Sequence, residues 1–310
     1  MYTRNIISQF SLQKTRVIKS ARIFTSTSSF STSSSSSPPP SSPPPPTTAE
    51  LVIQHGSNGI ITLSLNRHSA RNALSSSLLS SLSSQLVTFS KLSQTEARCL
   101  IIQSTVPRVF CSGADLKERA QLGSSLDAVK RAVDDIRETF TRIEELNFPT
   151  IAVIEGAAMG GGLELALACD LIIASKTATF GLPETTLGII PGAGGTVRLS
   201  RKIGLSASKY LIFTGKKISA TEGFEVGLLT ELTEEGQAYT TALRIAQSIA
   251  MNGPIAIRAA KQSLQDGTSV DINTALQIEE EAYGKVLPTK DRLEGLAAWK
   301  EKRVPNFKGE

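Results

Sequence analysis

The stretch EGAAMGGGLELALACD, residues 155–170, places three consecutive glycines before an apolar segment that carries a single acid. Glycine adopts backbone conformations that other residues avoid, and it lets a ligand approach the main chain closely. The apolar spacing after Gly160 predicts a short helix, with the amide of Gly161 at its N-terminus and Glu164 in its first turn. Glu164 could simply complement the helix dipole, but such acids are normally solvated, and its neighbours here are Leu and Ala. A carboxylate in apolar surroundings is instead a candidate acid or base with a shifted pKa.

A second glycine-containing segment, FCSGADLKE at residues 110–118, follows the apolar run CLIIQS. One interpretation is a turn between a strand and a helix, with Asp115 as the N-cap and Glu118 completing a capping box. The other interpretation concerns the amide of Ala114, which follows the flexible Gly113 at the start of the helix. Such an amide suits an oxygen that acquires negative charge.

The third segment is FGLPETTLGIIPGAGGT, residues 180–196. Glu184 follows Pro183 and precedes an uncharged stretch that extends to Arg198. The glycines at 192, 194 and 195 match no dinucleotide fingerprint, and they predict a turn that starts a helix. Glu164 and Glu184, together with two candidate amide donors, form a coherent acid–base site.

Signatures of several other chemistries are missing from the sequence. It contains only two histidines, His55 and His68, and no nucleophile elbow, His-Glu-x-x-His, Cys-x-x-Cys or P-loop. Its three cysteines have no metal-ligand or disulfide spacing, which predicts reduced core residues. We therefore expect the chemistry to come from carboxylates and backbone, with no metal and no redox cofactor.

Residues 1–49 are predicted to be a transit peptide followed by a Ser/Pro-rich spacer. They contain five of the 33 Lys and Arg residues and no Asp or Glu, so 28 basic residues balance 28 acidic ones in the rest. Such a basic, Ser-rich, acid-free segment is typical of a signal for organelle import. The alternative is an N-terminal tail with no targeting function. We favour the mitochondrial matrix over the chloroplast. No apolar run approaches the roughly 20 residues of a membrane-spanning helix.

From Leu51 onward, β-rich runs alternate with stretches of helical spacing, which predicts an α/β domain over residues 50–250. The predicted strands are GIITLSLNR, CLIIQST, TIAVIEG and LIIAS. After residue 250 the strand signal stops, and residues 251–310 predict three helices with apolar rows. We interpret this region as a second, smaller unit that mediates oligomerisation.

The three glycine-containing segments together resemble the signatures of the crotonase (enoyl-CoA hydratase/isomerase) superfamily over about residues 50–310. The tail PTKDRLEGLAAWKEKR and the final KGE resemble the mitochondrial branch that includes the AU-rich-RNA-binding methylglutaconyl-CoA hydratase. The resemblance implies a spiral of ββα units with an all-helical C-terminal region that builds homotrimers, often stacked as homohexamers.

The resemblance also implies a role for each site residue. The amides of Ala114 and Gly161 match the family's oxyanion hole, and Ala114, Asp115, Leu116 and Lys117 match its contact with the CoA thioester. Glu164 and Glu184 match the two glutamates of the hydratases, which add water to a 2-enoyl-CoA. We assign Glu164 as the base toward water and Glu184 as the proton donor. Coenzyme A belongs to the substrate, so no cofactor is implied.

Three functions remain open from the sequence: a hydratase of short-chain 2-enoyl-CoA in fatty-acid β-oxidation, a 3-methylglutaconyl-CoA hydratase of leucine degradation, and an RNA-binding protein with a vestigial site. The first is preferred, and intact acids and glycines argue against the third. The RNA-binding relative carries lysines along its first long helix, where this chain has serines and only Lys91. We expect RNA affinity at non-specific levels, roughly 10⁻⁴–10⁻⁶ M. Proteolysis of the Clp type lacks a suitably placed histidine, and His68, where the family commonly has proline, is not expected to be catalytic.

Overall fold

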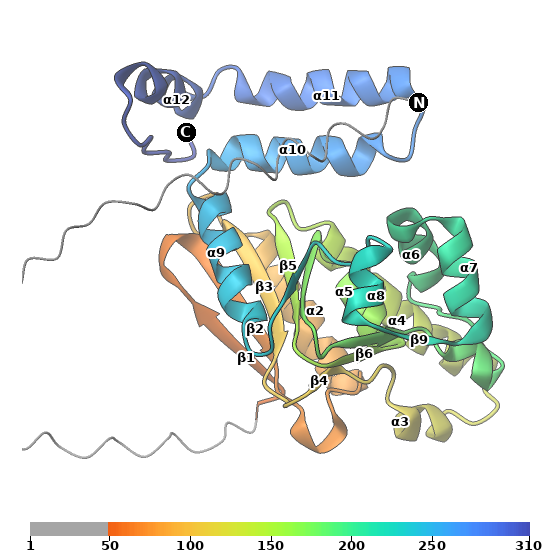
Figure 1. Ribbon diagram of the computed structural model, residues 1–310. Helices are drawn as coiled ribbons and strands as arrows, with labels where there is room; N and C mark the ends of the chain where they lie inside the picture. Colours follow the sequence, from red (N-terminus) through yellow and green to blue (C-terminus); the bar gives the residue numbers. More distant parts are fainter. Residues whose placement is uncertain (1–48) are drawn as a thin grey trace, which may run out of the picture. The chain divides into compact units, whose positions relative to one another are not determined.

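The computed structural model describes residues 49–310. The predicted transit peptide and spacer lie outside the described residues, apart from Ala49. Strands and helices alternate up to about residue 233, and helices alone follow (Figure 1). No helix within residues 49–310 has the length and apolar character needed to span a membrane.

The larger sheet has six strands in the order β1-β2-β3-β5-β7-β10. The first pair is antiparallel, and every other neighbouring pair is parallel. Parallel strands are covered on both faces, which explains why the predicted strands read as continuous Ile, Val and Leu runs. The strands are β1 (Leu51–His55), β2 (Ile60–Leu65), β3 (Cys99–Ser104), β5 (Thr150–Ile154), β7 (Leu171–Ser175) and β10 (Glu231–Thr233).

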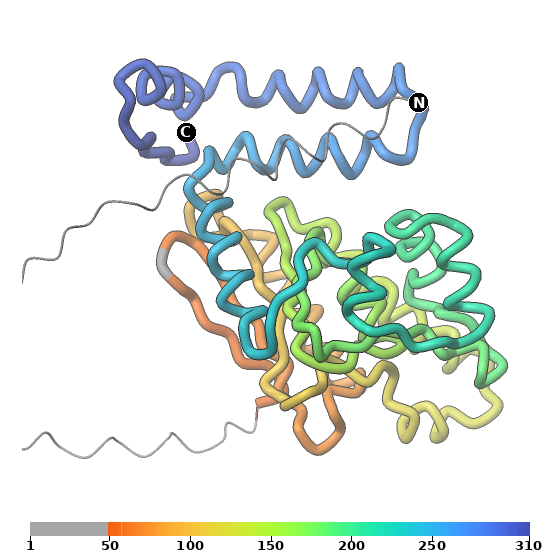
Figure 2. The backbone as a smooth tube through the Cα atoms, in the orientation of Figure 1, coloured from red at the N-terminus to blue at the C-terminus, as the bar shows by residue number. Residues whose placement is uncertain are grey.

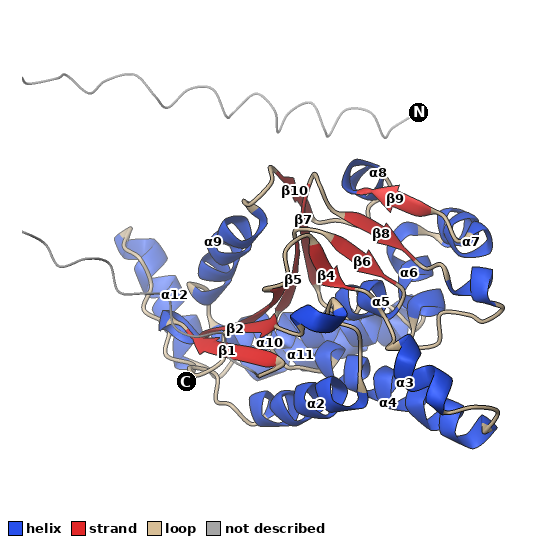
Figure 3. Ribbon diagram, turned by 90° about the horizontal axis from the view of Figure 1, so that it is seen from below, coloured by secondary structure: helices blue, strands red, loops and turns tan. Residues whose placement is uncertain are grey.

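A smaller sheet of four short strands lies beside the larger one (Figure 3), in the order β4-β6-β8-β9. β4, β6 and β8 run parallel, and β9 pairs antiparallel with β8. Each of β4, β6 and β8 follows a strand of the larger sheet and leads into a short helix, which is the repeated ββα unit of the expected spiral. The bounds are β4 (Val109–Cys111), β6 (Ala157–Met159), β8 (Thr179–Gly181) and β9 (Lys217–Ser219).

Helices cover both faces of the larger sheet. On one face α9 (Ala238–Ala250) packs through Ala238, Ala242 and Ala246, whose small side chains let the helix approach Ile101 and Val153 closely. The other face forms the main core with the smaller sheet and with helices that include α2 (Ser76–Ser90), α4 (Leu126–Glu144) and α5 (Gly161–Leu167). The other helices before the C-terminal region are α3 (Leu116–Gln121), which has no buried residue, α6 (Gly195–Ile203), α7 (Leu205–Thr214) and α8 (Ala220–Glu225), with 3₁₀ turns η1 (Ser57–Gly59), η2 (His68–Ala70) and η3 (Glu184–Leu187).

The C-terminal region consists of α10 (Pro254–Gly267), α11 (Ile272–Val286) and α12 (Lys290–Glu301). α10 and α11 pack against each other, as the ribbon and the tube show in one orientation (Figures 1 and 2). The buried Lys261 of α10 connects this region to the core, because its Nζ donates to the Phe148 carbonyl at 3.1 Å and pairs with Asp170 at 2.8 Å. The role of the C-terminal region in oligomerisation stays a prediction, as does the division of the chain at residue 250.

Candidate active site

The three segments singled out in the sequence lie at the carboxyl ends of three adjacent parallel strands, β4, β6 and β8. The chain leaves β4 toward Gly113 and Ala114, β6 toward Gly160 and Gly161, and β8 toward Glu184. Carboxyl ends of parallel strands meet at one edge of a sheet, so segments about 50 and 20 residues apart in sequence converge. They line a cavity of about 600 Å³, and all seven predicted site residues contribute to it: Ala114, Asp115, Leu116, Lys117, Gly161, Glu164 and Glu184.

Two backbone amides face this cavity from different segments. A Cβ built on Gly113 would lie 3.3 Å from the Gly161 nitrogen, and one on Gly161 would lie 3.6 Å from the Ala114 nitrogen. The two amides are therefore close neighbours. Within residues 49–310, neither of them donates a hydrogen bond to any acceptor. Two adjacent unpaired amides, one of them at a helix N-terminus, form a site for an oxygen that develops negative charge.

The glycines of the opening stretch are required by close approaches. Gly160 has φ +52° and ψ −125°, and a Cβ there would lie 3.0 Å from Oε1 of Glu184. A Cβ on Gly162 would lie only 2.2 Å from the Cys111 carbonyl oxygen. Larger residues at these positions would displace either an acid of the site or the strand that leads to Ala114.

Glu164 is held by two backbone amides from the start of α6. Its side chain is 3% exposed, and its Oε1 accepts hydrogen bonds from the Ala193 amide at 2.9 Å and the Gly195 amide at 2.7 Å. Burial raises the pKa of Glu164, while the two amides act in the opposite direction because they stabilise the carboxylate. These bonds fix one carboxylate oxygen and orient the other.

Glu184 has a different environment. It is the first residue of η3, and its Oε2 is buried with no hydrogen-bond partner among the described residues. Burial, together with the charge of Glu164, raises the pKa of Glu184 to about 7, although its own backbone amide and Arg119 act in the opposite direction. At neutral pH a substantial fraction of Glu184 is therefore protonated. The pair consists of a carboxylate stabilised by amides and a carboxyl group that retains its proton readily.

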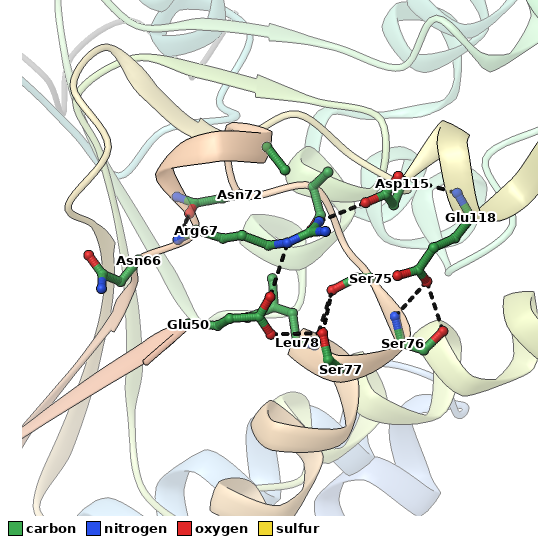
Figure 4. Close-up of polar contacts among 12 residues, drawn as sticks. Glu50, Asn66, Arg67, Asn72, Ser75, Ser76, Ser77, Leu78, Asp115 and Glu118 are labelled. Carbon is green, nitrogen blue, oxygen red and sulfur yellow. Dashed lines mark hydrogen bonds and ion pairs between the residues drawn. The ribbon is translucent and has the colours of Figure 1, made fainter. Parts of the chain in front are cut away.

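A polar network holds the loop that carries Ala114 (Figure 4). Arg67 pairs with Glu50 at 3.0 Å and with Asp115 at 2.7 Å. Asp115 caps α3 by accepting from the amides of Lys117 and Glu118, and the hydrogen bond from Arg67 lowers its pKa. The capping box expected for Glu118 is wrong, because its carboxylate accepts from the amide and hydroxyl of Ser76 instead. Glu118 therefore connects α3 to α2.

The sequence did not identify the partners of Glu164. The glycines at 192, 194 and 195 predict a turn that starts a helix, and α6 does begin at Gly195 with Gly194 at φ +107° as its N-cap. The local sequence does not indicate that the amides of this turn donate hydrogen bonds to Glu164. A buried acid without a charged neighbour requires donors, and a glycine-rich helix start elsewhere in the chain is a signal that could have supplied them.

The three cysteines lie in the core, as the sequence predicts. Cys99, Cys111 and Cys169 are all buried and free. Burial raises the pKa of each thiol to about 12, so none of them is a reactive thiolate.

The sequence and the fold are similar to those of known proteins. A protein-family model described as "Enoyl-CoA hydratase/isomerase" matches residues 55–310. "Probable enoyl-CoA hydratase 2, mitochondrial" of Arabidopsis thaliana is 49% identical over 253 residues, covering 81% of this chain and 82% of the relative. "Methylglutaconyl-CoA hydratase, mitochondrial" of Homo sapiens is 47% identical over 268 residues, covering 84% and 78%. A crystal structure of enoyl-CoA hydratase from Bacillus anthracis has a TM-score of 0.81 and 46% identity, covering 84% of this chain and all of the other.

Proposed function

The chain belongs to the enoyl-CoA hydratase/isomerase family and is a hydro-lyase, and on this basis we propose that it adds water across the 2,3 double bond of a 2-enoyl-CoA thioester. The observation that carries the proposal is the combination in one cavity of two unpaired amides and two glutamates in contrasting environments. Two amides and two acids are what hydration of an enoyl thioester requires.

The proposed reaction follows from these environments. Glu164 takes a proton from a water molecule as the water oxygen bonds to C3. The electrons of the double bond shift onto the thioester oxygen, where the amides of Ala114 and Gly161 stabilise the enolate. Each amide is worth roughly 10²–10³ in rate, by the scale of other oxyanion holes. Protonated Glu184 then delivers its proton to C2, which completes the addition of one water.

The mouth of the cavity suits the phosphates of coenzyme A. Lys117 and Arg71 are exposed cations that line it, whereas Arg67 is paired with Glu50 and Asp115. Deeper in the cavity the walls are apolar and include Val133 and Ile136 of α4. A charged mouth and an apolar interior fit a substrate with an anionic carrier and an acyl chain.

Two acyl groups remain candidates, because the relatives are named for different substrates. The preferred substrate from the sequence is a straight short-chain 2-enoyl-CoA of β-oxidation, and the alternative is 3-methylglutaconyl-CoA of leucine degradation. Both would use Glu164 and Glu184 in the same way. An RNA-binding protein with a vestigial site is disfavoured, since the acids and amides are all in place.

Location and assembly are also proposals. The relatives from Arabidopsis thaliana and Homo sapiens are named mitochondrial, which supports a mitochondrial protein and, with the basic leader, import into the matrix. Exposed apolar side chains on α11 and α12, including Ile272 and Trp299, support a homotrimer or homohexamer.

Substitution of the two acids tests the proposed chemistry. Glu164→Gln and Glu184→Gln should each reduce hydration of crotonyl-CoA by at least about 10²-fold, the scale of a positioned acid or base. The loss of enoyl-thioester absorbance measures the rate. Glu225→Gln, on the exposed face of α8, is the matched control and should leave turnover unchanged. Near-normal turnover by a folded Glu164 or Glu184 variant would remove that residue from the mechanism.

A further inference from the structure

Asn72 is a buried polar residue that the proposed reaction does not use. It is 0% exposed, so it touches no substrate. Its side-chain nitrogen donates to the Ser104 hydroxyl at 2.8 Å and to the Phe110 carbonyl at 2.8 Å. Its side-chain oxygen accepts from the Arg67 amide at 2.8 Å (Figure 4). A buried amide group that makes hydrogen bonds to three segments of the chain fixes their positions relative to one another.

The backbone of Asn72 has a left-handed conformation. Its φ is +54°, and that of the preceding Arg71 is +53°. Asparagine is one of the few residues besides glycine that adopt this region readily. In this conformation the Arg71 carbonyl accepts from the Ser112 amide at 3.2 Å, and the Asn72 carbonyl accepts from the Cys111 thiol at 3.0 Å. The chain after η2 is therefore bonded both to the end of β4 and to the residue that follows it.

The same segment holds the loop that carries the Ala114 amide. Leu74 and Ala114 form a parallel β-bridge. The Leu74 amide donates to the Gly113 carbonyl at 2.8 Å, and the Leu74 carbonyl accepts from the Asp115 amide at 3.2 Å. Successive residues of an extended chain direct their main-chain groups to opposite sides. Because the residues on either side of Ala114 face Leu74, the Ala114 amide faces away from it, which leaves that amide available to the cavity.

We propose that Asn72 is a positioning residue for the oxyanion hole, because its side chain holds residues 71–74 and these set the direction of the Ala114 amide. The proposal rests on the proposed hydration and adds a residue to it. Asn72 lies two residues before Leu74, so a shift of its backbone moves the bridge. A displacement of about 1 Å can cost about 10²-fold in rate. The loss falls on the transition state, in which the thioester oxygen carries its charge.

Acetoacetyl-CoA measures the oxyanion hole without turnover. Its C2 lies between two carbonyls and loses a proton to solvent, which gives an enolate that near-ultraviolet absorbance distinguishes from the keto form. Donors that stabilise the enolate raise the ratio of enolate to keto form in the complex. When the absorbance is divided by the amount of bound ligand, the ratio describes the folded complex alone. A variant that is only less stable therefore keeps the wild-type ratio.

Two substitutions separate the side chain of Asn72 from its backbone conformation. Asn72→Asp keeps the acceptor for the Arg67 amide and loses both donors, whereas Asn72→Gly keeps the left-handed backbone and loses the side chain. Each should lower the bound enolate-to-keto ratio by about 10- to 100-fold. Each should also lower kcat for crotonyl-CoA by a similar factor, with KM changed less than about 3-fold. Asn58→Gly is the matched control and should change neither, because Asn58 is an exposed left-handed residue of η1 at φ +61°.

Ser104→Ala tests the same network with Asn72 unchanged. It removes one acceptor of the Asn72 side chain and should lower the ratio by about 3- to 10-fold, the scale of one hydrogen bond. This variant decides the outcome if neither Asn72 variant folds, and a wild-type ratio in it would then overturn the proposal. An Asn72→Gly variant with the wild-type ratio would also overturn it, because only the backbone conformation would matter.

The two assays distinguish this proposal from the proposed hydration. If the wild type stabilises the enolate in a way that depends on Asn72 but does not hydrate crotonyl-CoA, the hydration fails while the role of Asn72 stands. If the wild type hydrates crotonyl-CoA and the Asn72 variants keep the wild-type ratio, the hydration stands while the role of Asn72 fails.

Discussion

Glu164 and Glu184 show how one residue type can lie in two contrasting environments within one cavity. Both are removed from water, which raises the pKa of both. Glu164 receives two compensating hydrogen bonds, from the amides of Ala193 and Gly195, whereas Glu184 has one such bond, from its own backbone. The buried Oε2 of Glu184 receives none among the described residues, and its pKa is about 7. The division into base and proton donor inferred from the sequence therefore has a physical basis, and the roles themselves stay a prediction.

The raised pKa of Glu184 makes stability depend on pH. Its ordinary value is 4.5 and its folded value is about 7, so between these values the folded protein holds a proton that the unfolded chain has released. Stability contributed by this group is present below pH 4.5 and decreases as the pH rises to about 7. Glu184→Gln removes the ionisation, so the variant should exceed the wild type in Tm by more at pH 8 than at pH 5. Thermal unfolding at both pH values measures this, with Glu225→Gln as control. An equal difference at the two pH values would contradict the raised pKa.

At the scale of elements, the start of α6 determines where Glu164 lies. A Cβ on Gly195 would lie 2.8 Å from Oε1 of Glu164 and 2.8 Å from Cβ of Pro191. Gly195→Ala should therefore displace the carboxylate or the helix start and reduce hydration by about 10²-fold, the scale of a misplacement of about 1 Å. The hydration rate of the variant is measured together with its circular dichroism, which reports whether it is folded.

The matched control for Gly195→Ala lies in the same helix. The hydroxyl of Ser200 donates to the Val197 carbonyl within α6 and not to the site, so Ser200→Ala should leave turnover unchanged. A fully active Gly195→Ala variant would show that α6 does not position the acid.

Elements also explain what could be predicted from the sequence. The parallel strands β3, β5 and β7 and the tail helices α10 to α12 have strong patterns, and the structure places them where the sequence did. β4, β6 and β8 have only three residues each, too few for a periodicity, so the smaller sheet was not predicted. Arg119 and the amides of α6 were also missed, because their proximity to Glu164 and Glu184 depends on that sheet. Such contacts join residues that are far apart in the chain, so the local sequence of one segment does not predict them.

At the scale of the whole molecule, the ion pair between Lys261 and Asp170 attaches the C-terminal region to the core. Lys261 is 7% exposed, and Asp170 also accepts from the amide and hydroxyl of Thr150. Lys261→Ala should lower the free energy of unfolding by about 2 kcal/mol, the scale of a hydrogen bond to a charged group, since it removes the cation that pairs with the partly exposed Asp170. Denaturant titration measures the change. Lys290, which pairs with Glu310 on the surface, is the control, and Lys290→Ala should have no measurable effect. Equal effects of the two substitutions would show that the buried pair adds nothing.

The exposed apolar side chains of the tail predict its part in assembly. Ile272 is 70% exposed, Leu293 58% and Trp299 83%, which is unusual for surfaces that stay in water. A chain truncated after Asn252 should be monomeric or aggregated and should lack hydratase activity, although both acids remain. Size exclusion with light scattering, combined with the crotonyl-CoA assay, measures both properties. An active, monodisperse monomer would show that the tail neither assembles the protein nor completes its site.

The unpaired amides of Ala114 and Gly161 have a consequence for how this scaffold can evolve. They belong to the main chain, so a change of side chain at position 114 leaves the donor in place. The acids are side chains, and a single nucleotide change can remove or replace either one. Mutation can therefore change the acids of the site while both amide donors remain available. Ancestral or laboratory lineages of this fold should change their reaction by changing acids while they keep the same thioester activation.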